Sequence, residues 1–205
     1  LEDQNGFWIR RIYLTFDFDV AENWTARLRM EANTPGDFET SGKLEPFVKD
    51  AYLAWKGGDH SILMGISPSP TFEHIEGFWG YRAVEKTPLD LYRMGSSRDF
   101  GVAAKGRLAG GRVFYHAMLG NGAGESSETN EGKKAMLAVG FQATDALVFE
   151  LYADTEDRPD SADRTTYQGF LGGKGGTDRA ALQHAHDDPH PDGGKDAPLA
   201  VGSIF

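Results

Sequence analysis

Cysteine and long apolar runs are both missing from this sequence. None of the 205 residues is cysteine, which excludes a disulfide framework and thiolate metal sites. No segment approaches the roughly 18 to 20 uninterrupted apolar residues of a transmembrane helix. The formal net charge is −10, and no basic stripe is present to attract a phosphate backbone. A helical membrane protein is therefore excluded, and a nucleic-acid partner is not expected.

Motifs that carry enzyme chemistry are also scarce. The glycine-rich segment GNGAG at 120–124 leads into an acidic stretch and not into a helix, so a phosphate cradle is unsupported. Serine, histidine and aspartate are present, but no nucleophile elbow of the G-x-S-x-G type accompanies them. The sequence therefore predicts no enzyme, no cofactor and no metal site.

What the sequence does contain is an alternation of apolar and polar residues over 8–19 and 24–33. Because neighbouring side chains of a strand point to opposite faces, each segment is predicted to be a strand with one apolar and one charged face. Strands of this length are longer than most soluble ones and match a tilted crossing of a bilayer. The apolar positions are Trp8, Ile12, Leu14, Phe16 and Phe18, then Trp24, Ala26, Leu28, Met30 and Ala32.

Short and long connections alternate along the chain. Further strands are predicted at 47–56, 61–65, 98–107, 112–120, 134–143, 147–154 and, in part, 199–205. Short connections lie at 20–23, 57–60, 108–111 and 144–146, and long ones at 34–46, 66–97, 121–133 and 155–164. Short periplasmic turns and long extracellular loops are typical of outer-membrane barrels. We therefore expect an all-β, antiparallel transmembrane barrel, with about 10 to 11 strands present in a single domain, 1–205.

Strand direction adds an expectation about the ends of this domain. The first strand runs into a short turn, so it descends from the outside and requires an earlier ascending strand. The segment at 199–205 resembles a strand that stops partway. We therefore expect a domain that is incomplete at both ends and belongs to a larger barrel. The alternative is a soluble β-sandwich that binds a ligand and whose apolar face packs against a second sheet.

Four segments carry a resemblance to a known family. They are FWIRRIYLTFDFDVAENWTARLRME, FVKDAYLAW, WGYRAVEKTPLDLYRMGSSRDFGV and YHAMLGNGAGE, which together extend over 7–125. The chain resembles the phosphate-selective porin O and P family. The resemblance implies a barrel of roughly sixteen strands in the bacterial outer membrane. It further implies a homotrimer that contacts lipid and lipopolysaccharide and passes small hydrophilic solutes, anions among them.

Candidate solute contacts are the cations expected to face the lumen. They are Arg11, Arg27, Arg29 and Lys105 in predicted strands, with Arg82, Lys86, Arg93 and Arg98 in or just after the connection 66–97. The first hairpin would bring Arg11 near Glu31 or Asn33, and Arg27 near Asp17 or Thr15. Structural pairing with carboxylates and a ladder that guides solutes both remain open. Anion preference is not established.

The connection 66–97 mixes aromatic residues with cations and is too long for a simple surface loop. It either folds inward and narrows the pore or forms an extracellular or intersubunit loop. The segment 184–192 concentrates histidines and carboxylates, where zinc could bind, although an acidic mobile loop is the favoured interpretation. Besides a porin, we consider a porin-like sheath that holds an electron-transfer partner across the membrane.

Overall fold

In the part of the chain that the structure describes, eleven antiparallel strands form one sheet, in the order of the sequence. The computed structural model of the protein describes residues 7, 9–34, 43–80, 86–158, 163–175, 178–190 and 199–204. The strands are β1 (Arg11–Ala21), β2 (Trp24–Asn33), β3 (Phe47–Gly57), β4 (His60–Pro68), β5 (Arg98–Leu108), β6 (Val113–Gly120), β7 (Lys134–Thr144), β8 (Leu147–Glu156), β9 (Asp163–Gly175), β10 (Asp178–His190) and β11 (Leu199–Ile204). Between β4 and β5, the described residues form the short helices α1 (Glu73–Trp79) and α2 (Pro88–Leu91).

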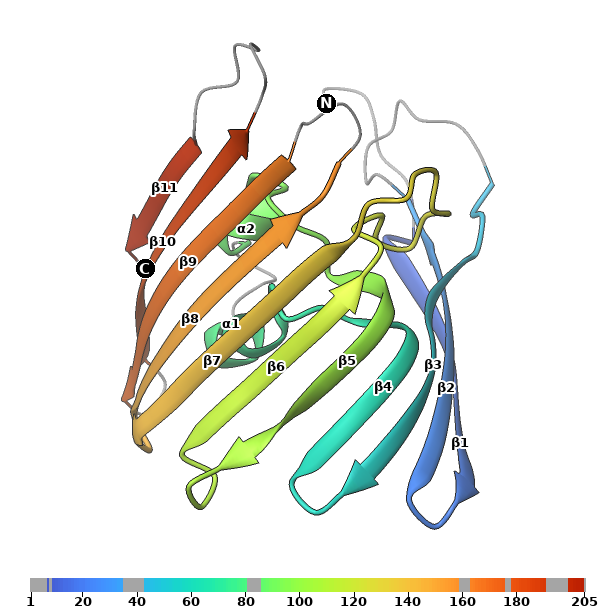
Figure 1. The fold of residues 1–205 in the computed structure, drawn as a ribbon, viewed down its shortest axis with the longest axis horizontal. Helices are drawn as coiled ribbons and strands as arrows, with labels where there is room; N and C mark the ends of the chain where they lie inside the picture. The colour runs from blue at the N-terminus through green and yellow to red at the C-terminus, as the bar shows by residue number, and fades with distance from the viewer. Residues whose placement is uncertain are drawn as a thin grey trace.

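The sheet is curved and open. Each strand pairs with its neighbours in sequence, and β1 and β11 are the two edges of the sheet. Figure 1 shows the strands bending around α1 and α2, which lie on the concave side of the sheet. The all-β, antiparallel prediction is therefore confirmed. Among the described residues, no helix has both the length and the apolar character needed to span a membrane.

The period-two alternation of the sequence separates the two faces of the sheet. In β1, Phe16 and Phe18 are outward and about half exposed, and Asp17 between them points inward toward Arg27 of β2. The same alternation continues in β7, where buried and exposed residues alternate from Lys134 to Phe141. In β8 the even-numbered residues from Val148 to Asp154 are buried. The convex face is thus apolar and uncovered, and the concave face carries the charges.

The segment between β4 and β5 packs against the concave face. Phe72, Leu89 and Met94 are buried against the inward side chains of the sheet. Ile75 of α1 joins a second cluster with Phe114 and other inward residues. The described part of 66–97 therefore packs against the concave face, as the inward alternative predicts. Residues 81–85, which include the candidate Arg82, lie outside the described residues.

Two strands differ from the sequence-based expectation. The region 163–190 forms the hairpin of β9 and β10, so the interpretation of 184–192 as a mobile loop is wrong for its described part, which ends at His190. Glycines in β9 and polar residues in β10 weaken the apolar alternation that identifies strands. Predicted strands from 47–56 to 147–154 correspond to β3 through β8, with shifted ends. Trp8 lies outside the described residues.

Gly140 provides a test of inward packing. A Cβ built at Gly140 would lie 1.8 Å from Cζ of Phe114, whose ring is buried over this glycine. We expect Gly140→Ala to displace that ring and lower the free energy of unfolding by about 1–3 kcal/mol. Guanidinium titration of the folded protein, followed by tryptophan fluorescence, measures the change.

The matched control is Gly169→Ala in β9. A Cβ at Gly169 would meet nothing closer than Cδ2 of Leu151, at 3.9 Å. Because ordinary van der Waals contact is retained there, little loss of stability is expected. Equal losses in the two variants would contradict the packing of Phe114 over Gly140.

Candidate functional site

The first hairpin pairs its arginines with carboxylates on the inward face. Nε of Arg11 lies 2.9 Å from Oε1 of Glu31. Arg27 donates two hydrogen bonds to Asp17, from Nε at 2.7 Å and from the terminal nitrogen at 3.1 Å. Both pairings were predicted from the turn position, and both are confirmed. The Arg27–Asp17 pair is largely exposed, so solvent screens its attraction.

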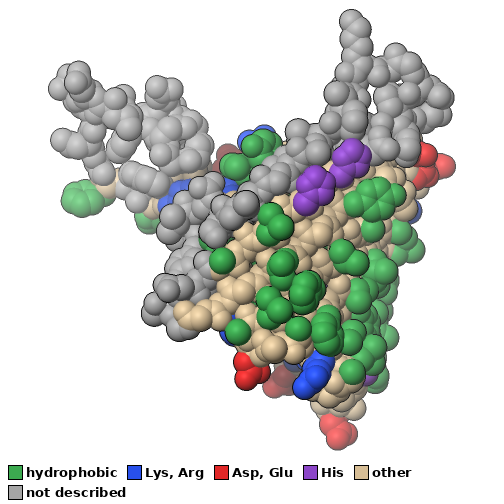
Figure 2. Space-filling view, turned by 90° about the vertical axis from the view of Figure 1, so that its left-hand side faces the viewer, with side chains coloured by type: hydrophobic (Ala, Val, Ile, Leu, Met, Phe, Trp, Pro, Cys, Tyr) green, Lys and Arg blue, Asp and Glu red, His purple; other side chains and the backbone are tan. Residues whose placement is uncertain are grey.

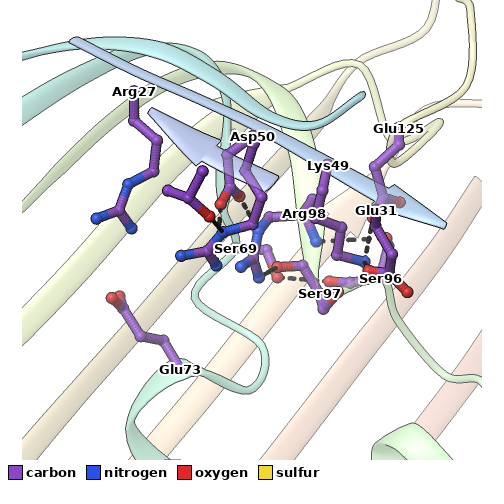
Figure 3. A network of polar contacts seen from close by, with 12 residues as sticks. Arg27, Glu31, Lys49, Asp50, Ser69, Glu73, Ser96, Ser97, Arg98 and Glu125 are labelled. Atoms are coloured by element: carbon purple, nitrogen blue, oxygen red, sulfur yellow. Dashed lines mark hydrogen bonds and ion pairs between the residues drawn. The ribbon is translucent and has the colours of Figure 1, made fainter. Parts of the chain in front are cut away.

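Asp50 is the centre of a more buried set of contacts. Its side chain is 1% exposed. A terminal guanidinium nitrogen of Arg29, in β2, lies 3.3 Å from Oδ2, and Nε of Arg98, at the start of β5, contacts Oδ1. The Arg98 guanidinium also donates a hydrogen bond to the carbonyl oxygen of Ser97, at 2.8 Å. Figure 3 shows Arg98 beside Asp50 within this network of polar contacts. This carboxylate therefore joins β2 and β3 to the end of the segment 69–97 between β4 and β5, which we call the inward segment.

A β-bulge places Lys49 beside the same set. The register between β2 and β3 shifts between Arg29 and Met30, so Lys49 has no partner opposite it in the ladder. Its amine lies 2.5 Å from Oε1 of Glu125 and 3.6 Å from Oε2 of Glu31. The bulge thus allows two consecutive residues, Lys49 and Asp50, to serve the concave face, which period-two reasoning does not anticipate.

Glu73, the first residue of α1, attaches this helix to the concave face of the sheet. One carboxylate oxygen lies 2.5 Å from Nζ of Lys105, and the other lies 2.9 Å from Nδ1 of His116. Burial alone would raise the pKa of Glu73, but the contacts with His116 and Lys105 outweigh it and lower the pKa to about 2. Glu73 is therefore ionised at neutral pH and holds α1 against β5 and β6.

His74 makes the second attachment of α1. Its ring stacks on Phe114 with centroids 3.6 Å apart, and its Nδ1 lies 3.3 Å from Oε2 of the buried Glu150. Burial, with a smaller contribution from the charge of Arg107, lowers the pKa of His74 to about 4. The imidazole is therefore neutral at pH 7, and its contact with Glu150 is not an ion pair between two charged groups.

Two hollows on the concave face lie beside these contacts. One of about 640 Å³ is bounded by α1 and by β5 to β8, with Lys105, Arg107 and His116 in its lining. Another, of about 510 Å³, includes Arg27 and again Lys105. Both hollows carry positive and negative side chains together, so they suit small hydrophilic molecules and do not form a purely cationic surface.

The remaining candidate cations are more scattered. Nζ of Lys86 lies 3.2 Å from Oδ1 of Asp90, a local contact within the inward segment. Arg93 is exposed, has a left-handed φ of 54°, and borders a separate hollow of about 210 Å³. Five of the eight candidates contact carboxylates of the concave face or, for Lys105, of α1: Arg11, Arg27, Arg29, Arg98 and Lys105.

Several residues of this face escape sequence reasoning. Lys134 lies 3.2 Å from Asp154 and 3.3 Å from Glu156, across β7 and β8. Lys134 and the even-numbered acids of β8 share inward parity, which is the signal that could have identified them. Glu73 and His74 have no comparable signal, because their partners lie far away in the sequence.

The sequence matches no family model and no curated protein. The likeness to the porin O and P family therefore rests on the four segments quoted above.

Asp50 and Asp17 offer a matched comparison of buried and exposed pairing. Asp50→Asn leaves Arg29 and Arg98 without their shared counter-charge in a buried setting. We expect the free energy of unfolding to fall by about 3 kcal/mol. Asp17→Asn should change it little, because Asp17 is exposed to solvent. Guanidinium titration of both variants measures the difference, and equal effects would contradict a structural role for Asp50.

Proposed function

We propose that this chain forms part of the wall of an outer-membrane channel for small hydrophilic solutes. The observation that carries the proposal is the charge-free convex face. Away from the strand ends, the described outward side chains of β1 to β10 include no Asp, Glu, Lys or Arg. Outward residues such as Leu151, 71% exposed, and Leu119, 59% exposed, would suit lipid better than water.

Aromatic residues at the ends of the strands support the same proposal. Trp24 and Trp55 face each other across β2 and β3, beside the short turns. Nδ1 of His60 and the hydroxyl of Tyr115 are hydrogen-bonded at 3.0 Å near the same end of β4 and β6. Amphipathic rings of this kind favour the membrane interface. In a closed barrel this end of the sheet would be the periplasmic side.

The inward segment would act as the constriction of such a channel. α1 is fixed to the wall by Glu73 and His74, and the two mixed-charge hollows lie beside it. A solute that moves along the concave face would pass these groups. Positioning of the helix by directional polar contacts is what a fixed constriction requires, because a loosely held segment would not define a pore width.

Selectivity follows from the balance of charge on the concave face. Most of the candidate arginines and lysines contact carboxylates, which favours structural pairing over a ladder that guides anions. We therefore propose diffusion of small polar solutes with weak charge preference. We retain the homotrimer, with lipid and lipopolysaccharide around it, as the assembly that the family resemblance implies.

The alternative functions fit these contacts less well. A sheath around an electron-transfer partner needs an open interior, but 69–97 packs into the hollow over its described part. A β-sandwich needs a second sheet on the apolar face. The described strands all belong to one sheet, and its apolar face is the uncovered convex one.

Bilayer recordings with acid titration test both the channel and its constriction. Because the pKa of Glu73 lies below its ordinary 4.5, the attachment of α1 is fully present above pH 4.5 and is lost as the pH falls toward 2. We expect discrete conductance at pH 6 that rises or becomes noisy as the pH falls to 2. Glu73→Gln should show the higher conductance already at pH 6 and a smaller acid response.

Glu131→Gln is the matched control, because Glu131 is an exposed residue outside α1. It should behave like the unmodified protein at every pH. An absence of conductance in all proteins would contradict the channel. Conductance that is identical in Glu73→Gln and the unmodified protein would contradict only the role of α1 as the constriction.

A further inference from the structure

The hollow beside α1 combines aromatic rings with polar groups that have no partner in the described part of the chain. Its volume is about 640 Å³, and α1 and β5 to β8 bound it on the concave side of the sheet. The apolar convex surface, part of which Figure 2 shows, is on the opposite side of the sheet. All the residues that line the hollow belong to the described ranges. A ligand in this hollow would therefore lie inside the proposed channel and would not meet lipid.

His74 of α1 brings one free nitrogen to this hollow. Its Nδ1 is buried and lies 3.3 Å from Oε2 of Glu150, whose side chain is fully buried. Its Nε2 is accessible and has no hydrogen-bond partner among the described residues. Phe114 stacks on one face of the ring, and 29% of the His74 side chain remains exposed. A ligand can therefore reach Nε2 of a ring that packing holds in place.

Arg107 and Asp59 supply further free groups at the rim of the hollow. They are neighbours, because the backbone N–H of Arg107 donates to the carbonyl oxygen of Asp59 at 3.1 Å. Both side chains are exposed, and neither forms an ion pair within the described part of the chain. The guanidinium donates to the carbonyl oxygen of Gly111 at 3.2 Å, which leaves most of its five N–H donors available. The rim thus offers donors and an acceptor side by side.

The charges around the hollow balance one another. Lys105 is paired with Glu73, and Asp59 matches Arg107. A free anion would meet two carboxylates here, and a free cation would meet two basic groups. A hydroxyl group avoids both costs, because it can donate to a carboxylate and accept from a guanidinium. It also suits the neutral imidazole of His74, to which it can donate or from which it can accept in either tautomer.

From this geometry we infer that the hollow binds a neutral, polyhydroxylated solute, namely a mono- or disaccharide. Its volume is within the roughly 300–1,000 Å³ of small-molecule sites, which combine apolar surface with a few polar groups. The rings of His74 and Phe78 supply flat surface for the C–H face of a sugar, and the rim binds its hydroxyl groups. The inference rests on the proposed function, since it names the class of solute that the channel would pass.

Saturation-transfer NMR of the folded full chain with maltose at pH 7 measures this binding directly. We expect saturable binding that equal concentrations of sodium phosphate or tetramethylammonium chloride do not reduce. His74→Phe keeps a ring against Phe114 but lacks Nε2. It should weaken maltose binding about two- to tenfold, the value of one hydrogen bond. Arg107→Leu should weaken it by a similar factor.

Gly77→Leu tests the space itself. Gly77 of α1 lines the hollow, and a Cβ built there meets nothing within 4 Å. A leucine would therefore fit without displacing α1, but it would occupy part of the hollow. Maltose binding should fall at least as much as in His74→Phe, and far-UV circular dichroism checks that each variant is folded.

His184→Phe is the matched control, because it makes the same substitution in β10, outside the hollow. It should bind maltose like the unmodified protein. The inference is overturned if maltose does not bind, if phosphate or tetramethylammonium displaces it, or if folded His74→Phe and Gly77→Leu bind it as tightly as the unmodified protein. Bilayer conductance without maltose binding would overturn only this inference, whereas maltose binding without conductance would contradict only the channel.

Discussion

The separation of charge from apolar surface across one curved sheet is the constraint on which the rest of the structure depends. Strand residues alternate in direction, so the register of each hairpin decides which side chains meet. Arg27 meets Asp17 because β1 and β2 are joined by a tight turn at this register. A shift of one residue would move the charges of β1 to the convex face and its phenylalanines into the hollow.

The same separation creates the setting for the inward segment. A concave face that is only polar would not hold a folded segment, and one that is only apolar would not hold charges. Here Leu63 and Met118 of the sheet share one buried apolar cluster with Phe72 and Leu89. Lys105 and His116 fix Glu73 at the start of α1. Apolar burial supplies the favourable free energy, and the directional polar contacts determine where the helix lies. The segment is therefore attached by both kinds of interaction.

Local pattern predicts the structure well where contacts are near in sequence. The pairs of Arg11 and Arg27 follow from one turn, and their partners are found as expected. The contact of Glu73 with Lys105 does not follow, because nothing in the alternation of β5 specifies which helix residue will face it. Lys49 was missed because a bulge breaks the period, and β9 because its glycines replace the apolar residues that identify a strand. Residues joined by distant segments thus need the structure itself.

The central claim is that the convex face meets lipid, and Leu151→Arg tests it most directly. Leu151 is an outward residue in the middle of β8. Unfolding from phosphatidylcholine vesicles by guanidinium should show a loss of about 2–4 kcal/mol, the cost of arginine near the bilayer centre. Leu91→Arg, at an exposed position in the inward segment, should change the value by no more than about 0.5 kcal/mol. An unchanged free energy of unfolding in Leu151→Arg would mean that water, and not lipid, meets this face.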